Sequence, residues 1–161
     1  MIGVDLTLTK TGDYAVRSAL ALASSYREGR YVTIAEVADR MALPRTFTPQ
    51  VLGRLARAGI AESKAGRGGG YRLTRDPKDI SMLEVVEAAE GSLINTRCTL
   101  RGGPCRRDDR CVVHDTWIAA GEALRRALAS SSLAAVAVAD TDPGARPHVE
   151  AIDRSSVLRS S

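Results

Sequence analysis

The chain has 161 residues, of which 44% are hydrophobic but only 4% aromatic, so we expect an aliphatic core. This length suggests one domain, with room for an appended segment, and the composition fits a mainly helical protein better than a β-sandwich. No run of about 18 apolar residues occurs, and no basic stretch precedes an apolar one at the N-terminus, so we expect neither a membrane span nor a signal peptide. The expected location is cytoplasmic, where thiols stay reduced.

Positive charge gathers in the first half of the chain. Residues 1–80 hold 13 Lys and Arg against 8 Asp and Glu, a net charge of +5, whereas residues 81–161 hold 10 against 11, a net charge of −1. This asymmetry suits a polyanionic partner such as nucleic acid, and it equally suits an ordinary solubility charge.

The first 41 residues predict two helices. Residues 8–30 carry alanines and leucines at helical spacing, and Gly29 marks the end of that helix. Residues 33–41 open with Thr33 and, three positions later, Glu36, which is the pattern of a capping box at a helix start.

A third helix is predicted over residues 45–59. Pro49 places its start near Thr46 to Thr48, because proline is tolerated in the first turn of a helix and not in its interior. Two helices joined by a short turn form a helix-turn-helix candidate. The second of them carries three cations, Arg45, Arg54 and Arg57.

A basic hairpin is predicted directly after this helix pair. The stretches "IAES" (60–63) and "YRLT" (71–74) alternate like strands, and "KAGRGGG" (64–70) between them is a flexible tip with two cations. In this order and at these lengths, the elements indicate a winged helix.

The second half of the chain predicts two more helices and a tail. Residues 81–91 form a short helix and residues 114–133 a longer one, whose apolar stripe serves either the core or a dimer seam. We therefore divide the chain into a DNA-binding domain at 7–80, a loop with a dimerisation helix at 81–133, and a disordered tail at 134–161.

All three cysteines and one histidine lie within 17 residues, spaced as Cys98-x6-Cys105-x5-Cys111-x2-His114. Thiolates and imidazole suit a structural zinc site or an iron–sulfur cluster. Zinc sites usually contain two cysteines two to four residues apart, and their absence here favours a cluster. The other interpretation is three incidental cysteines. No Ser-His-Asp set, nucleophile elbow or phosphate loop is apparent, so we expect no enzyme.

Four stretches resemble the iron–sulfur cluster regulators of the IscR/NsrR type, in the Rrf family of dimeric winged-helix transcription factors. They fall within residues 7–133 and read "LTKTGDYAVR", "VTIAEVADRMALP", "RGGGYRLTRDPKDISMLEVVEAAEG" and "CTLRGGPCRRDDRCVVHDTW". The resemblance implies a mainly α fold with a small β-hairpin wing, a sensor loop and a long dimerisation helix.

The resemblance also implies the ligands of a [2Fe–2S] or [4Fe–4S] cluster. Three come from the loop cysteines, Cys98, Cys105 and Cys111. The fourth is His114 by similarity to IscR-like members, or Asp13 of the partner subunit by similarity to NsrR-like members. We favour His114, because "CVVHDTW" resembles the IscR pattern. The first gap between cysteines is one residue longer than usual in the family.

DNA contacts carry over from the family less completely. Pro49 stands where IscR-like proteins have an acidic residue, whereas Gln50 matches a base-contacting glutamine. Ala65 occupies the usual place of the wing arginine, with Lys64 and Arg67 beside it. The predicted DNA-binding residues are thus Arg45, Thr46, Thr48, Gln50, Lys64 and Arg67.

These features together predict a homodimeric transcriptional repressor that binds a near-palindromic operator in double-stranded DNA. Its cluster would sense redox state, nitric oxide or iron–sulfur status. One alternative keeps the DNA-binding module with a zinc or thiol switch and no cluster. A second alternative is an iron–sulfur electron carrier or assembly protein without DNA binding.

Overall fold

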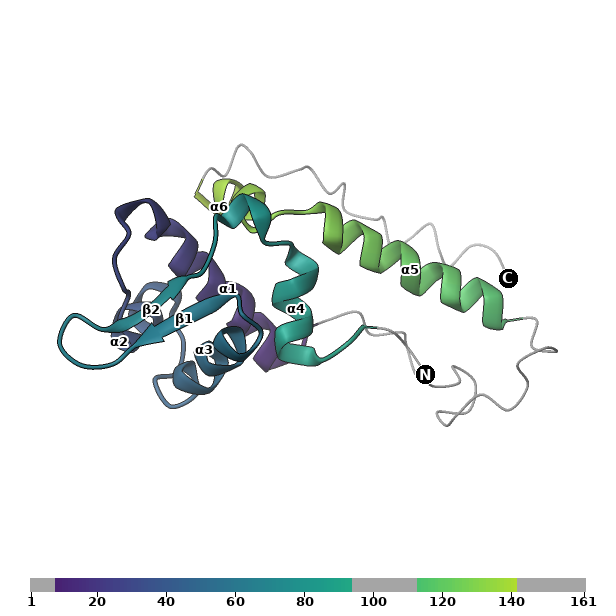
Figure 1. Cartoon of the computed structure of the whole chain (residues 1–161). Coiled ribbons are helices and arrows are strands. Elements are labelled where there is room, and N and C mark those ends of the chain that lie inside the picture. Colours follow the sequence, from purple (N-terminus) through teal and green to yellow (C-terminus); the bar gives the residue numbers. More distant parts are fainter. Residues whose placement is uncertain (1–7, 94–112, 142–161) are drawn as a thin grey trace.

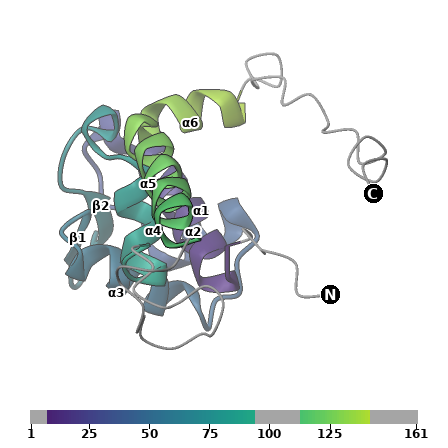
Figure 2. The same cartoon turned by 90° about the vertical axis from the view of Figure 1, so that its right-hand side faces the viewer.

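The computed structural model describes residues 8–93 and 113–141 of the chain. Helices α1 to α4, the hairpin and α6 form one body, and α5 projects past α4 (Figures 1 and 2). The described elements in chain order are α1 (Lys10–Ser24), the 3-10 turn η1 (Tyr26–Glu28), α2 (Ile34–Met41), α3 (Thr48–Arg57), β1 (Ala61–Lys64), β2 (Gly70–Leu73), the 3-10 turn η2 (Pro77–Asp79), α4 (Met82–Glu90), α5 (His114–Ser130) and α6 (Leu133–Thr141). A mainly helical fold with a β-hairpin wing is thereby confirmed.

Side-chain caps begin three of the helices. The predicted capping box at α2 is present, since Glu36 N donates to Thr33 Oγ1 and Thr33 N donates to the Glu36 carboxylate. An equivalent box between Ser81 and Glu84 begins α4, and the Thr9 hydroxyl accepts from an amide of α1. These bonds satisfy amides that have no partner inside the helix.

Helix α1 ends earlier than predicted, at Ser24 rather than near Gly29. The Ser24 hydroxyl donates to the carbonyl of Ala21 at 2.8 Å, which competes with continued helical hydrogen bonding. The chain then passes through η1, and Gly29 closes that turn in a left-handed conformation with φ 65°.

The core is aliphatic, as the composition predicted. Helix α1 lies at its centre and packs against α2, α3, α4 and α6. Among the described residues, the buried hydrophobic side chains include no aromatic ring. The largest of them are Leu22, Leu52, Leu55, Ile60, Ile80 and Leu133.

The wing is an antiparallel hairpin in which Ala61 pairs with Leu73 and Lys64 pairs with Gly70. Val32 extends it, because its amide and carbonyl exchange two 2.8 Å hydrogen bonds with Tyr71. Gly70 has φ 140°, and a Cβ there would overlap the Val32 carbonyl. The glycine run therefore lets the backbone of the α1–α2 connection approach the wing closely.

The tail prediction is wrong for residues 134–141, which belong to α6. Leu133 is fully buried, and its amide donates to the Ile80 carbonyl at 2.8 Å. The Met82 amide donates in turn to the carbonyl of Ser131 at 2.8 Å, so this junction is bonded to the start of α4. Residues 133–138 are almost uniformly apolar, so they carry no polar–apolar stripe from which a helix could be recognised.

The apolar stripe of α5 contributes little to the core of a single chain. No residue of α5 is buried, and Ile118 and Leu124 are 42% and 40% exposed. Leu128, near its end, packs against the core as a partly buried side chain. The sequence left two roles open for this stripe, the core of the single chain or a dimer seam. Most of α5 does not belong to the core of the single chain.

Candidate nucleic-acid interface and cysteine segment

The start of α3 presents a group of exposed side chains. Pro49 lies in its first turn, as predicted, and that turn contains no acidic residue. The positive end of the helix dipole is therefore uncompensated, which favours a nearby anion. The exposed side chains around it are those of Arg45, Thr46, Phe47 and Gln50.

Arg45 is exposed but already paired. Its Nη2 lies 3.0 and 3.1 Å from the two carboxylate oxygens of Asp39 in α2. With 68% of the Arg45 side chain exposed, this is a solvent-screened pair that a phosphate can displace at small cost.

Thr48 was predicted to contact DNA, and that prediction is wrong. The residue is only 1% exposed, and its hydroxyl donates to the Pro44 carbonyl at 2.9 Å. It therefore stabilises the turn before α3 and presents no group to a phosphate or a base.

Phe47 is an exposed residue that the sequence analysis did not select. It is 53% exposed at the position immediately before α3. The sequence did contain a signal for this residue. Phe47 is the chain's single phenylalanine, and it precedes the buried apolar residues of α3, which are Val51, Leu52 and Leu55. Such a ring can make apolar contact with a thymine methyl group.

The wing carries the other two predicted cations. Lys64 ends β1, and its Nζ lies 5.7 Å from the centre of the Tyr31 ring. Arg67 is exposed at the tip between Gly66 and Gly68, which have φ values of 83° and 72°. Within the described residues, Arg67 forms no salt bridge, so its charge is available to a polyanion.

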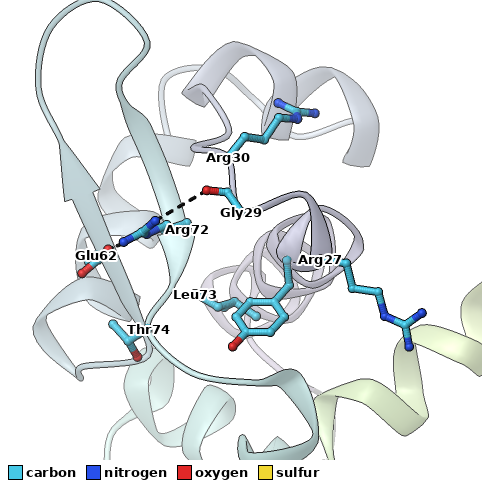
Figure 3. A pocket seen from close by; sticks show the side chains of 8 residues that line it. Arg27, Gly29, Arg30, Glu62, Arg72, Leu73 and Thr74 are labelled. Carbon is cyan, nitrogen blue, oxygen red and sulfur yellow. Dashed lines mark hydrogen bonds and ion pairs between the residues drawn. The ribbon is translucent and has the colours of Figure 1, made fainter.

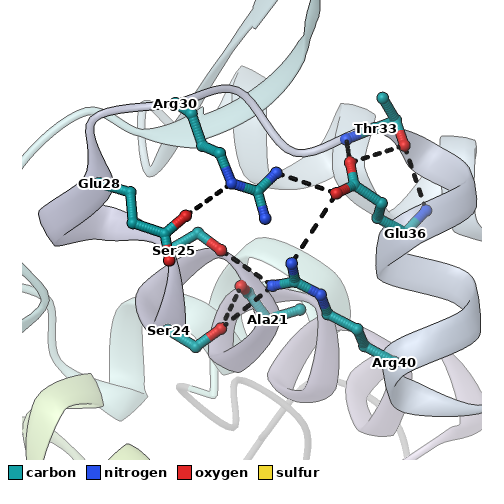
Figure 4. Close-up of polar contacts among 8 residues, drawn as sticks. All are labelled: Ala21, Ser24, Ser25, Glu28, Arg30, Thr33, Glu36 and Arg40. Carbon is teal, nitrogen blue, oxygen red and sulfur yellow. Dashed lines mark hydrogen bonds and ion pairs between the residues drawn. The ribbon is translucent and has the colours of Figure 1, made fainter.

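A polar cluster joins the end of α1 to α2 (Figure 4). Arg30 lies 2.6 Å from Glu28 and 2.9 Å from Glu36, while Arg40 donates to the Ser25 hydroxyl at 2.9 Å. Hydrogen bonds from the Thr33 amide and hydroxyl, supported by Arg30, lower the pKa of Glu36 to about 2. The cluster keeps Glu36 ionised and fixes the helix-turn-helix to the preceding turn.

A pocket of about 440 Å³ lies between η1 and β2 (Figure 3). Three arginines line it, but Arg72 is bound to Glu62 and to the Gly29 carbonyl, and Arg30 is paired as described. The guanidinium groups of Arg27 and Arg30 extend outward from the pocket (Figure 3). The lining therefore offers little uncompensated charge to a small anion.

Of the predicted cluster ligands, Cys98, Cys105 and Cys111 lie outside the described residues. His114 is the first residue of α5 and is partly exposed. Asp13 lies in the first turn of α1, where its carboxylate accepts from Arg17 Nε at 3.0 Å. Within residues 8–93 and 113–141, no three His, Cys, Asp or Glu side chains converge in a metal-binding group.

The end of α4, directly before residues 94–112, is bonded to three other helices. Glu90 accepts from the Thr9 amide at 2.9 Å and from its hydroxyl at 2.7 Å. Arg54 of α3 donates to the Ala89 carbonyl at 2.7 Å, and Glu87 forms an ion pair with Arg125 of α5. A movement of this end of α4 would therefore change its contacts with α1, α3 and α5.

The described part of the chain contains no helix with the length and apolar character needed to cross a membrane.

Comparisons of sequence and of structure both find transcription regulators named IscR. The chain is 35% identical over 128 residues to the HTH-type transcriptional regulator IscR of Photorhabdus laumondii, which covers 80% of this chain and 77% of that one. It is 36% identical, with the same coverage, to the IscR of Xenorhabdus nematophila. These relatives are transcription regulators, a class that is not enzymatic, which confirms the expectation of no enzyme.

Two solved structures of transcription regulators have folds similar to that of this chain. T. potens IscR matches with a TM-score of 0.68 and 27% identity over 86% of this chain and 90% of its own. The cysteine regulator CymR of B. subtilis matches with a TM-score of 0.67 and 23% identity over 83% and 98%, which is a likeness of fold. The Rrf2 family model, described as "Iron-dependent Transcriptional regulator", matches residues 8–139. The chain therefore belongs to the Rrf2 family of winged-helix transcription regulators.

Proposed function

We propose that this regulator is a cytoplasmic homodimeric repressor that binds a near-palindromic operator. The start of α3 would enter the major groove and the wing would follow the adjacent backbone. The observation that carries this proposal is the exposed set Arg45, Thr46, Phe47 and Gln50 around a first turn without acidic residues. Helix N-termini and arginines are common phosphate contacts, and such contacts position the protein on the duplex.

Base recognition would come from Gln50. A glutamine forms a bidentate pair with adenine in the major groove, which discriminates against other bases by about 1–3 kcal/mol. Thr46 and Arg45 would contact phosphates beside it. Arg67 and Lys64 on the wing would contact phosphates or enter the minor groove.

Dimerisation would use α5. Its exposed large apolar side chains are Ile118 and Leu124, which are about two-fifths exposed in the single chain. Gly121 lies on the same helix with open space around it, so a second helix can approach closely there. A two-fold dimer would place its two α3 helices in half-sites about one helical turn of DNA apart, ~10 bp or a multiple of that.

Control of DNA binding would come from an iron–sulfur cluster held by Cys98, Cys105, Cys111 and a fourth ligand. Three thiolates and an imidazole form a donor set that such clusters accept. We favour His114 as the fourth ligand over Asp13 of the partner subunit, because "CVVHDTW" resembles the IscR pattern. A bound cluster would supply a centre that changes with redox state, nitric oxide or iron–sulfur supply.

The contacts at the end of α4 would carry this signal to the DNA-binding surface. Residues 94–112 lie between α4 and α5 in the sequence. A cluster bound by the cysteines of this segment would therefore restrict the positions of the end of α4 and the start of α5. Arg54 then links α4 to α3 through the Ala89 carbonyl. Coupling of this kind requires that the two states place α3 differently.

The test is anaerobic purification followed by operator selection from random double-stranded DNA. We expect visible absorption, iron and sulfide in the protein, and a selected site with two-fold symmetry whose affinity changes when the cluster is removed. A colourless zinc protein with symmetric site selection would favour the zinc or thiol switch. A brown protein that selects no DNA would favour the electron carrier or assembly protein.

A further inference from the structure

One face of the wing contacts an aromatic ring, that of Tyr31, which belongs to the α1–α2 connection. Tyr31 follows the polar cluster of Arg30 and precedes Val32, which is bridged to Tyr71 of β2. The centre of its ring lies 4.7 Å from the Arg72 guanidinium carbon and 5.7 Å from Lys64 Nζ. The ring is thus attached to the body of the protein and touches the wing from one side.

Strand register explains why these charges meet at the ring. Glu62 pairs with Arg72, so both side chains lie on one face of the hairpin, and Lys64 follows Glu62 by two residues on the same face. Glu62 Oε1 accepts from Arg72 Nε at 2.5 Å and from the Tyr31 hydroxyl at 3.0 Å. Arg72 is therefore neutralised by its cross-strand partner.

Lys64 differs from Arg72 because no carboxylate among the described residues pairs with it. Its cross-strand partner is Gly70, which offers no side chain for contact. The Tyr31 ring is the group that faces the ammonium, and aromatic faces attract cations. The ring limits the positions of a long side chain without cancelling its charge.

The Tyr31 hydroxyl also contacts the wing, through Glu62. Its hydrogen bond to Glu62, together with burial, raises the pKa of Tyr31 above its ordinary value. The hydroxyl donates to Glu62, while the backbone hydrogen bonds between Val32 and Tyr71 keep the ring against the wing.

We infer that Tyr31 is a positioning residue for DNA recognition, which holds the wing cation Lys64 in a restricted set of orientations before a phosphate is bound. This inference rests on the proposed function. A restrained lysine loses less rotamer freedom when it binds, so its contact contributes more to affinity than that of an unrestrained lysine.

Operator affinity of the full-length dimer tests the inference, measured with Tyr31→Leu, Tyr31→Phe, Lys64→Ala and the Tyr31→Leu/Lys64→Ala double variant. A solvent-exposed cation–ring contact predicts a loss of about two- to five-fold for Tyr31→Leu. Tyr31→Phe keeps the ring, so its affinity should stay within about two-fold of the parent. In the Lys64→Ala background, Tyr31→Leu should cause no further loss, because the two residues act as a unit.

Tyr26→Leu is the matched control, since Tyr26 lies nearby in η1 and packs partly against the core. It should change operator affinity little and additively with Lys64→Ala. Additive losses for Tyr31→Leu and Lys64→Ala would overturn the inference, because they would indicate a general structural role. An unaffected Tyr31→Leu or an unaffected Lys64→Ala would also overturn it.

A second measurement does not depend on the folding of any Tyr31 variant. In the parent protein, the ring should shift the Lys64 side-chain methylene proton resonances upfield relative to the other lysines, and a missing shift would overturn the inference. Failure of the proposed function looks different. The parent protein itself would then select no operator. That result would contradict the proposed function and, with it, the role of Tyr31.

Discussion

Arg54 in α3 donates a hydrogen bond from Nη1 to the carbonyl oxygen of Ala89 in α4, at 2.7 Å. The acceptor belongs to the last turn of α4, where carbonyls have no partner within the helix. One guanidinium therefore caps α4 and joins it to the helix that we propose reads DNA.

Replacing Arg54 by Ala should lower the free energy of unfolding by about 1–2 kcal/mol, because the Ala89 carbonyl loses a charged donor. Urea denaturation of the purified protein measures this change. Arg57→Ala in the same helix is the control, since Arg57 forms no ion pair within the described residues, and it should stay within about 0.5 kcal/mol of the parent. Equal losses in both variants would contradict the capping role.

Gly70→Ala should strongly destabilise the wing. The residue has φ 140°, and a Cβ would overlap the Val32 carbonyl, so either the bridge to Val32 breaks or the hairpin moves. Gly29→Ala is the control, because Gly29 is also left-handed but has open space around it and should cost only about 1–2 kcal/mol. Thermal melts should show the larger loss for Gly70→Ala, and the reverse order would refute the close-approach argument.

Ionisation of Glu36 should make the free energy of unfolding depend on pH in the acid range. Hydrogen bonds from Thr33 and the charge of Arg30 lower its pKa from 4.5 to about 2, so its ionised form stabilises the folded state. This contribution is complete above pH 4.5 and is lost as the pH falls towards 2. The side chain is 39% exposed, so solvent screening reduces the expected effect to about 1 kcal/mol.

The comparison of Glu36→Gln with the parent at several pH values measures this contribution. The variant should be less stable than the parent at pH 7, and the difference should shrink as the pH approaches 2. Gln retains the capping geometry, so the variant isolates the charge. A difference that does not change with pH would mean that the charge of Glu36 is irrelevant to stability.

Arg67→Ala should weaken operator binding and lower the slope of log affinity against log salt concentration by about one, since one phosphate contact is lost. Fluorescence anisotropy between low and high salt gives this slope. Arg27→Ala is the control, because it removes an exposed arginine from η1, away from the wing tip. Equal slopes for the parent and Arg67→Ala would exclude Arg67 from phosphate contact.

His114→Ala should disturb the visible spectrum and iron content of the anaerobic protein more than Asp13→Ala does. Asp13 is engaged with Arg17, so its replacement should mainly remove that surface pair, worth at most about 1 kcal/mol. A larger loss of iron in Asp13→Ala would assign the fourth ligand to the partner subunit's Asp13.

Much of the fold follows from local signals in the chain. Thr33 and Glu36 indicate the start of α2, and Pro49 fits only the first turn of α3. The two predicted strands pair as an antiparallel hairpin. Each signal acts within a few residues, so it can be recognised without knowledge of the fold. The proposal of a cluster-binding segment rests on a local signal too, the spacing of its cysteines.

Other properties depend on residues that are distant in the sequence. Thr48 was predicted to contact DNA, but packing of α3 against the other helices leaves it only 1% exposed. Residues 134–141 resembled a tail, because a helix without a polar face is stabilised by its neighbours rather than by its own pattern.

The sequence by itself determined the family and the winged-helix order of elements, because motifs and periodicity are local properties of the chain. The tertiary structure alone decided that Arg54 reaches Ala89, that Tyr31 faces Lys64, and that α6 packs on α1. These contacts join segments that no local pattern relates. Their partners are chosen by chain packing, in which geometry and burial determine which groups meet.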